Sequence, residues 1–420
     1  MRAGPATQHT ALLQRFERSA LVAEDLGITG VVFDDVGDGS TIRVAGRAVV
    51  NFGNCSYLGL NLDERLKQGA IEATRRYGPL YSSSQAYSRV DLYDSLNDQF
   101  RQITGAPAVL LPPTTTLGHL ACLPALVGPE DTLVIDSHSH ASLQLTTQVL
   151  AGRGIEIVAV AHNDMEMLAD IVARLERPGR SIWYVADGIY SMYGDTSPAR
   201  RVARLMEQHP SLHCYFDDAH GFSWFGLHGR GLVLEEMEWN DRLVVAAGLA
   251  KSFGSGGALL AFGDPDAARR VRLVGGPMNF SGPIHPPTLG AMAASADIHL
   301  SPEHHELRRR MLQQIDLVST TLARHRLPVV SWNRTPIWLV RVGTFDNMLE
   351  VARRLVSDGF YLNPSAFPLV PVGMAGLRFT HTLSNTDAQV EGMIASFARH
   401  MHDVVGDFDT EVDLTAFESA

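Results

Sequence analysis

The sequence predicts an α/β fold with a large, mostly parallel β-sheet, followed by a smaller α+β domain. Short apolar runs alternate with helix-like segments between Ala108 and Ala246, and after Pro286 this alternation stops. A chain of 420 residues also exceeds one average domain, so two packed units are expected.

The first 50 residues are expected to form an N-terminal arm. Apolar positions recur at helical spacing over residues 7–25, which predicts a helix. Residues 31–34 and 41–44 then flank a turn that contains Gly37, Asp38 and Gly39, as the strands of a hairpin do.

The middle of the chain supplies the predicted sheet. Six apolar runs are separated mostly by helical segments, among them Met165–Leu175 and Ala199–Gln208; the runs are residues 108–111, 132–135, 155–160, 182–185, 213–216 and 243–246. Buried strands that alternate with helices indicate a mostly parallel sheet covered on both faces. Functional residues are expected at the carboxyl ends of these strands.

The pattern after Pro286 predicts a separate small domain. One long helical stretch is expected through His325, followed by short strands near residues 328–330 and 337–342, a helix, and a strand at 377–380. We therefore expect the large domain over residues 51–289 and the small domain over residues 290–420.

Composition excludes several classes of protein. The formal net charge is -11 and there is no long Lys/Arg run, so nucleic-acid binding is not expected. The three cysteines are far apart and lack CxxC spacing, which is typical of reduced thiols in a cytoplasmic protein. The N-terminal residues lack the apolar core of a signal peptide, and no apolar run reaches membrane-spanning length.

Lysine occurs only at Lys67 and Lys251, although lysine and arginine together number 35. Lys67 lies in a polar, helix-like stretch, where a solvated ammonium group is expected. Lys251 follows an apolar strand and precedes the glycine-rich turn at residues 252–257. An ammonium group is costly there unless its chemistry is used, as in a lysine that forms a Schiff base. The alternative is a lysine whose head group reaches solvent from the strand end.

A carboxylate follows another buried strand, in the segment 217–221 (Asp-Asp-Ala-His-Gly). A buried carboxylate needs a cation, and the protonated pyridine nitrogen of pyridoxal 5'-phosphate (PLP) is one. Asp217 is the candidate for this partner, and His220 could donate to the phenolate oxygen of the ring. A metal ligand pair or a helix cap is the alternative.

Two further segments fit a PLP site. His140 lies after the strand at 132–135 and could stack on the ring, although His138 and His140 could also ligate a metal. Residues 114–116 are three threonines that precede a helix-like run, where hydroxyl groups and a helix N-terminus could hold a phosphate.

Five motifs together resemble the α-oxoamine synthases, which are fold-type I PLP enzymes. The resemblance covers about residues 45–400, and its motifs occupy residues 51–60, 136–142, 187–195, 217–231 and 248–254. It implies a large, mostly parallel seven-stranded sheet domain and a smaller C-terminal α+β domain.

The resemblance also implies roles for individual residues. Lys251 is the Schiff-base lysine, Asp217 the pyridinium partner, His220 the phenolate donor and His140 the stacking histidine. The other residues expected at the cofactor are Thr115, Thr116, Asp187, Ser191 and Ser281. Ser281 matches a segment that reaches the phosphate of a neighbouring subunit, which implies a homodimer with shared active sites. Arg378 is expected to hold the substrate carboxylate, with Asn54 and Cys55 nearby.

Several positions depart from the family pattern. Gly248 stands where serine or threonine usually touches the phosphate, and Gly118-His119 replaces the typical Ala-Asn. Cys55 and Ser56 stand where an asparagine is common, and Tyr193 replaces a frequent aspartate. The cofactor site therefore looks intact, while the substrate side is altered.

The resemblance implies condensation of an amino acid with an acyl thioester, carried by coenzyme A or a carrier protein, with loss of carbon dioxide to give an α-aminoketone. Three alternatives remain open at the level of the sequence. They are other PLP chemistry (transamination, aldol cleavage or non-decarboxylative condensation), a non-catalytic subunit of a heterodimeric synthase, and a metal hydrolase built on His138, His140, Asp217, Asp218 and His220.

Overall fold

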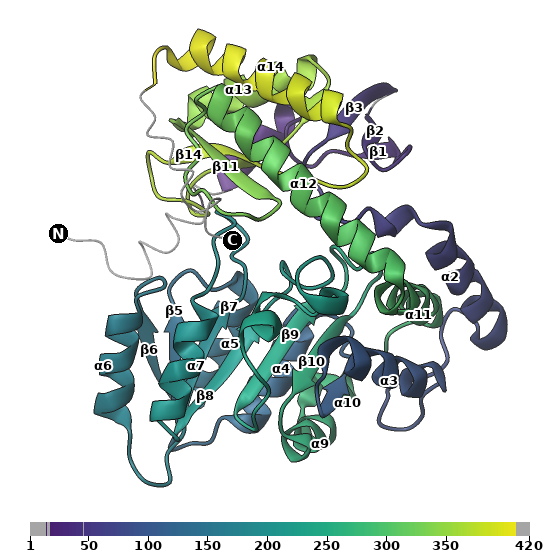
Figure 1. Ribbon diagram of the computed structural model, residues 1–420, viewed down its shortest axis with the longest axis vertical. Coiled ribbons are helices and arrows are strands. Elements are labelled where there is room, and N and C mark those ends of the chain that lie inside the picture. Colours follow the sequence, from purple (N-terminus) through teal and green to yellow (C-terminus); the bar gives the residue numbers. More distant parts are fainter. Residues whose placement is uncertain (1–13, 15–16, 45, 409–420) are drawn as a thin grey trace. The chain divides into compact units, whose positions relative to one another are not determined.

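The computed structural model describes residue 14, residues 17–44 and residues 46–408 (Figure 1). The chain divides into two compact units. The sheet unit comprises residues 56–191 and 195–310, and the terminal unit comprises residues up to 55, residues 192–194 and residues from 311 onward. The expected domains are contiguous segments, whereas residues 290–310 group with the sheet unit.

The sheet unit contains the predicted seven-stranded sheet, in the order β4-β10-β9-β8-β7-β5-β6. The strands are β4 (Ala108–Leu110), β5 (Thr132–Asp136), β6 (Glu156–Val160), β7 (Ile182–Asp187), β8 (Leu212–Asp217), β9 (Leu243–Gly248) and β10 (Ala258–Phe262). β10 pairs antiparallel with both of its neighbours, β4 and β9, and the other described strand pairs of this sheet are parallel. The predicted fold class is confirmed, and β10 is the run that follows the glycine-rich turn.

Both faces of this sheet are buried. Val134 of β5 belongs to one apolar cluster, and its neighbour Leu133 belongs to another. Successive side chains of a strand point to opposite faces, so the two clusters lie on the two faces. The helices that follow the strands are α4 (Thr115–Leu126), α5 (Ala141–Gly152), α6 (Met165–Leu175), α7 (Ala199–Gln208) and α9 (Pro265–Val274), and Figure 1 shows them beside the sheet.

A second group of helices packs through a glycine contact. It comprises α2 (Glu64–Tyr77), α3 (Leu92–Thr104) and α11 (Pro286–Leu300), with the short helices α8 (Leu232–Glu236) and α10 (Gly276–Phe280) elsewhere in the unit. A Cβ atom added to Gly290 of α11 would lie 2.0 Å from the carbonyl oxygen of Gly69 in α2. The two backbones can approach this closely only because neither residue has a side chain.

The prediction of one helix from Pro286 to His325 is wrong. Two helices, α11 and α12 (Pro302–Arg324), are separated by Ser301, which has extended backbone angles (φ -91°, ψ 164°). The ring of Pro302 disfavours helical geometry at the preceding residue and removes a backbone donor, which explains the break.

The terminal unit contains two small sheets. One has the order β1-β2-β3-β12, with β1 (Phe33–Asp35), β2 (Thr41–Val44), β3 (Arg47–Asn51) and β12 (Phe360–Tyr361). The other contains β11 (Ile337–Gly343), β14 (Ala375–Thr380) and β13 (Asn363–Ser365), with helices α13 (Phe345–Ser357) and α14 (Asp387–Val405) in the same unit.

The predicted elements of the terminal unit are largely confirmed. The N-terminal hairpin is the antiparallel pair β1 and β2, and residues 17–25 are helical. The remainder of the expected first helix lies outside the described residues, apart from Gln14. Near residues 328–330 the structure has one isolated bridge, between Val329 and Val340, in place of a strand.

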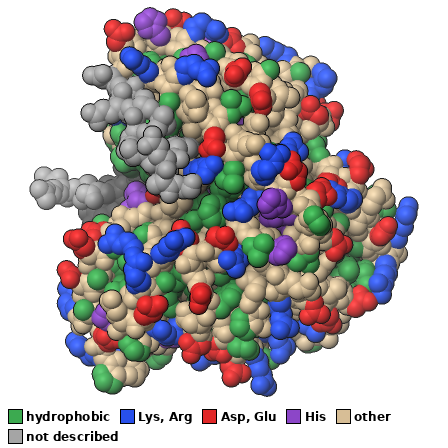
Figure 2. All heavy atoms as spheres, in the orientation of Figure 1, with side chains coloured by type: hydrophobic (Ala, Val, Ile, Leu, Met, Phe, Trp, Pro, Cys, Tyr) green, Lys and Arg blue, Asp and Glu red, His purple; other side chains and the backbone are tan. Residues whose placement is uncertain are grey.

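Two features of the structure concern possible partners: the distribution of surface charge and the length of the apolar helices. Acidic and basic side chains are mixed on the visible face of the sheet unit, with no broad region of one sign (Figure 2). Within the described residues, no helix is long and apolar enough to cross a membrane.

Candidate active site

Three acidic residues and a glycine end neighbouring strands of the parallel sheet. Asp136 ends β5, Asp187 ends β7, Asp217 ends β8 and Gly248 ends β9. Parallel strands place their carboxyl ends at the same edge of a sheet, so these residues meet there. Within this edge Asp187 and Asp217 lie directly opposite each other.

Lys251 lies at this edge, three residues after β9, and is half-buried. Its Nζ atom lies 3.7 Å from the point where a Cβ atom on Gly248 would be. Among the described residues no carboxylate lies within ion-pair distance of Lys251, whereas Lys67 pairs with Glu64 at 2.7 Å on the surface. The two lysines therefore differ in their surroundings, and the Schiff-base role of Lys251 stays a prediction.

Asp217 is buried and receives two hydrogen bonds. The backbone N–H of Ala219 donates to Oδ1 (3.0 Å), and Nε2 of His119 lies 3.0 Å from Oδ2. Burial by itself would raise the pKa of Asp217, but the hydrogen bond from His119 and nearby positive charge, including Lys251, lower this pKa to about 2. The carboxylate is therefore ionised and suited to a cationic ring nitrogen.

His140 and Asp187 are joined by a hydrogen bond. His140 is the N-cap of α5, and its backbone N–H donates to Oδ1 of Asp187 at 3.0 Å. Burial lowers the pKa of His140, which favours the neutral ring. A neutral imidazole ring can stack on a heteroaromatic group. Burial and the negative charge of Asp217 raise the pKa of Asp187 well above its usual value.

His220 is held by Tyr57, a residue without a role in the predicted site. Its Nδ1 atom lies 2.7 Å from the hydroxyl oxygen of Tyr57, and both side chains are buried. Tyr57 belongs to the Tyr-Leu-Gly segment of the first family motif, so the motif itself was the available signal. This hydrogen bond fixes the orientation of the His220 ring.

The N-terminus of α4 offers a phosphate site. The Thr114 hydroxyl accepts a hydrogen bond from the backbone N–H of Leu117 (3.2 Å) and caps the helix. Thr115 and Thr116 are the first two helical residues. The Thr115 Oγ1 atom lies 3.0 Å from the position that a Cβ atom on Gly248 would occupy. A helix N-terminus with hydroxyl groups beside a lysine suits a phosphate anion.

Ser191 and Ser281 are the remaining predicted cofactor residues. Ser191 follows β7, in the loop whose Gly188 N–H donates to the Asp217 carbonyl oxygen at 2.8 Å. Ser281 follows α10, and its hydroxyl donates to the carbonyl oxygen of Pro277 at 2.5 Å. Contact of either serine with the cofactor stays a prediction.

The predicted substrate residues lie together in the terminal unit. Arg378 of β14 is only 8% exposed, and its Nη2 atom lies 4.0 Å from Sγ of Cys55. The Thr380 hydroxyl donates to the backbone carbonyl of Asn54. A buried guanidinium group beside these residues can bind a carboxylate, and this role stays a prediction.

The residues of the metal alternative do not form a ligand cluster. Within the described residues there is no group of three or more His, Cys, Asp or Glu side chains placed to hold a metal ion. His138 instead stacks on His162, with ring centroids 4.1 Å apart. His162 in turn contacts carboxylate oxygens of Asp136 (3.0 Å) and Asp195 (2.5 Å).

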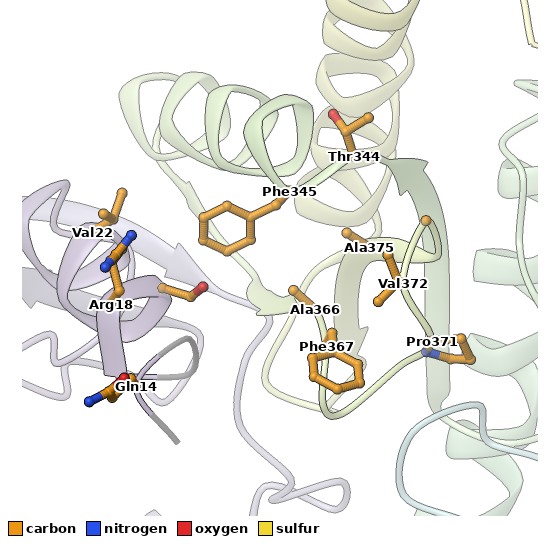
Figure 3. Close-up of a pocket in the computed structure, with 12 residues that line it drawn as sticks. Gln14, Arg18, Val22, Thr344, Phe345, Ala366, Phe367, Pro371, Val372 and Ala375 are labelled. Atoms are coloured by element: carbon orange, nitrogen blue, oxygen red, sulfur yellow. The ribbon is translucent and has the colours of Figure 1, made fainter. Parts of the chain in front are cut away.

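The terminal unit also has a cavity of about 690 Å³. Figure 3 shows Phe345, Phe367 and Val372 among its lining side chains. Of the described residues that line it, Arg18 alone carries a charge. This cavity lacks the acid–base groups that gather at the edge of the large sheet.

Comparison with known proteins gives the family. Residues 47–397 match the model of the family "Aminotransferase class I and II". The 8-amino-7-oxononanoate synthase of Geobacter sulfurreducens is 31% identical over 366 residues, which cover 86% of this chain and 91% of that protein. The serine palmitoyltransferase of Sphingobacterium spiritivorum is 26% identical over 367 residues, covering 85% and 88% of the two chains.

A solved structure has the same fold. The serine palmitoyltransferase of Sphingomonas wittichii superposes with a TM-score of 0.86 at 22% identity, covering 96% of this chain and 99% of that one. This likeness confirms the predicted fold class, and the family model and the named relatives confirm the predicted family and its cofactor. The alternative of a non-catalytic subunit is not supported. The chain belongs to the class I and II aminotransferase family and, within it, to the α-oxoamine synthases, which are PLP-dependent enzymes.

Proposed function

We propose that this α-oxoamine synthase joins an α-amino acid, held by Arg378, to an acyl thioester and releases carbon dioxide and a free thiol. The product is an α-aminoketone. Family membership gives the reaction class, because relatives are named as 8-amino-7-oxononanoate synthase and serine palmitoyltransferase. The observation that carries the proposal is that ionised Asp217 and Lys251, with which no described carboxylate forms an ion pair, lie at the same edge of the sheet.

The residues at this edge fit PLP. When bound, PLP supplies an electron-poor ring that stabilises negative charge at the α-carbon of an amino acid. Lys251 would hold its aldehyde carbon, Asp217 its ring nitrogen and His220 its phenolate oxygen. His140 would cover one face of the ring, and the N-terminus of α4 with Thr115 and Thr116 would hold the phosphate.

Each side chain has a defined part in the chemistry. Asp217 stays ionised, so it favours the protonated state of a nitrogen beside it. The Nζ atom of Lys251, once free, can accept the α-proton of the amino acid because no carboxylate among the described residues engages it. His220, oriented by Tyr57, can donate to an oxygen without turning away.

Arg378 gives the proposal its substrate class. A guanidinium group can bind both oxygens of a carboxylate in one plane, which selects α-amino acids over simple amines. Cys55, which lies beside Arg378, is one of the positions that depart from the family pattern. We therefore expect Cys55 to alter which amino acid is accepted.

A homodimer is the proposed assembly. Tyr87, Leu273 and Phe280 are 86%, 54% and 90% exposed, and they line one groove with a volume of about 750 Å³. Large apolar side chains that are exposed together mark interaction surfaces. Phe280 directly precedes Ser281, which the family pattern assigns to the phosphate of a neighbouring subunit. We further propose a cytoplasmic location, supported by three free thiols: Cys55, Cys122 and Cys214.

The function is tested with a panel of amino acids crossed with acyl thioesters of coenzyme A and of a carrier protein. We expect mass spectrometry to find an α-aminoketone for at least one pair, with carbon dioxide and thiol released only when both substrates are present. The variant K251A is the control and should produce none.

Two outcomes would contradict the proposal. A keto acid or an aldehyde in place of an aminoketone would indicate transamination or aldol cleavage on the same scaffold, because a shared fold does not fix the reaction. Thiol release without carbon dioxide would indicate a non-decarboxylative condensation.

A further inference from the structure

Two buried carboxyl groups lie side by side at the end of the sheet. Asp187 and Asp217 are opposite residues of the paired strands β7 and β8, and both are at most 6% exposed. Two buried carboxylates this close resist simultaneous ionisation. Some neighbouring group must decide which of them carries the charge.

The hydrogen bonds to the two groups differ in kind. Asp187 receives the backbone N–H of His140, and Asp217 receives the backbone N–H of Ala219, each at 3.0 Å. Only Asp217 has in addition an imidazole, with Nε2 of His119 at 3.0 Å from its second oxygen. The lowered pKa of Asp217 and the raised pKa of Asp187 agree with this asymmetry.

His119 is itself fixed from its other side. Its Nδ1 atom lies 2.7 Å from the hydroxyl oxygen of Tyr215, and both residues are fully buried. Burial raises the pKa of Tyr215 well above its usual value, so the phenol keeps its proton. The phenol then donates to Nδ1, and the N–H at Nε2 points to Asp217. This arrangement gives every polar atom of the row Tyr215–His119–Asp217 a partner.

The row is built from two elements. Tyr215 and Asp217 are two residues apart on β8, so their side chains share one face of the sheet, and His119 comes from α4. His119 is one of the positions that depart from the family pattern, which has Ala-Asn where Gly118 and His119 stand.

We propose that His119 is a positioning residue that keeps the negative charge on Asp217, and not on Asp187, and thereby keeps the cofactor's ring nitrogen protonated. The inference rests on the proposed function, in which Asp217 faces that nitrogen. His119 touches neither cofactor nor substrate in this role. Its effect passes through Asp217.

The test uses holoenzyme loaded with PLP that carries ¹⁵N in the ring, because the ¹⁵N resonance reports directly whether this nitrogen is protonated. In H119A we expect the resonance to move toward the unprotonated position. The kcat value should fall about ten- to hundredfold with a small change in KM, as for other groups that act through a neighbour. In H119Q, whose amide can still donate to Asp217, most of the resonance shift should be restored.

Three comparisons keep the test decisive. H299Q changes another fully buried histidine of the sheet unit and should leave the ¹⁵N resonance unchanged. Y215F removes one hydroxyl and should shift the resonance in the same direction as H119A, by less. A folded, PLP-loaded H119A with the wild-type resonance would overturn the proposal, and Y215F with the wild-type resonance would do so if H119A does not fold.

The variant D217N separates this inference from the proposed function. If D217N loses the protonated resonance while H119A keeps it, His119 has no positioning role and the function stands. If D217N keeps the wild-type resonance, Asp217 does not face the ring nitrogen, and the proposed arrangement of the cofactor fails instead.

Discussion

Thr115 and Gly248 occupy positions that limit each other's side chains. A Cβ atom at residue 248 would lie 3.0 Å from Oγ1 of Thr115 and 3.3 Å from Cβ of Ala219. The family pattern described above places serine or threonine at position 248, in contact with the cofactor phosphate. In this chain the Thr115 hydroxyl lies in the space beside Gly248, so it can supply the phosphate contact that Gly248 cannot.

This relation predicts a non-additive pair of substitutions. T115A should weaken PLP binding about tenfold, because a hydrogen bond to a charged group is worth about 1.5–3 kcal/mol. G248S alone should also weaken binding, since its Cβ meets Thr115. The double variant T115A/G248S should bind PLP better than T115A does.

The measurement is the dissociation constant of PLP, obtained by titrating apoprotein and following the cofactor's absorbance. A T116A variant is the matched control, because Thr116 is not among the three nearest neighbours of a Cβ atom at position 248, which are Thr115, Ala219 and Lys251. If the effects of T115A and G248S on the free energy of PLP binding are strictly additive, the hydroxyl of Thr115 does not replace a hydroxyl at position 248.

At the scale of elements, His162 links the ends of strands in the sheet. Its ring contacts Asp136, at the end of β5, and Asp195, in the loop after β7. Burial by itself would lower the pKa of His162, but hydrogen bonds to the two carboxylates raise it to about 9. Because folding raises the pKa of this histidine, the protonated ring stabilises the folded state.

This predicts stability that depends on pH. The contribution is fully present below the unfolded pKa of about 6.5 and is lost as the pH rises through the folded pKa. H162Q should therefore lower the free energy of unfolding by about 1–3 kcal/mol at pH 6, and by less at pH 10. Urea denaturation at both pH values measures this, with H402Q, at an exposed histidine, as control. An equal loss at pH 6 and pH 10 would rule out the charged ring as the cause.

The crossing of α2 and α11 predicts a second effect at this scale. G290A places a Cβ atom 2.0 Å from the Gly69 carbonyl oxygen, so the helices must move apart. The free energy of unfolding should fall by about 1–3 kcal/mol, as for other overpacked sites. Gly152 of α5 has open space around its Cβ position, so G152A should leave stability unchanged or slightly raised. Equal effects of the two substitutions would show that the crossing tolerates a side chain.

At the scale of the whole molecule, the proposed dimer predicts complementation between two inactive variants. K251A removes the reactive amine, and S281D places a negative charge where the phosphate of a neighbouring site is expected. If Ser281 serves the other subunit's site, a mixed dimer combines both defects in one site and leaves the other site intact.

Co-expression of K251A and S281D with different tags tests this. Random pairing should restore about a quarter of wild-type activity, because half of the dimers are mixed and half of their sites are intact. Sedimentation of F280D, at the exposed side chain beside Ser281, should show more monomer than wild type. No recovery of activity in purified mixed dimers would mean that Ser281 acts within its own subunit or not at all.

The sequence by itself determined the strands of the large sheet, and it predicted the main residues of the candidate site. Apolar runs bounded by helical segments predicted the strands because burial on both faces of a parallel sheet leaves a local signature. Lys251 and Asp217 were predicted as site residues because a charged group at the end of a buried strand costs free energy unless it has a partner or a chemical role. The break at Ser301 was missed, although Pro302 was the available local signal.

Only the tertiary structure decided the contacts between residues distant in the chain. His119 lies 98 residues before Asp217, and Tyr57 lies 163 residues before His220, so no local pattern pairs them. Asp187 and Asp217 lie side by side because β7 and β8 are neighbours in the sheet. The order of strands in a sheet is not encoded in the local sequence of the strands. Local periodicity encodes which face of an element is buried, whereas the partner on that face is set by how the elements pack.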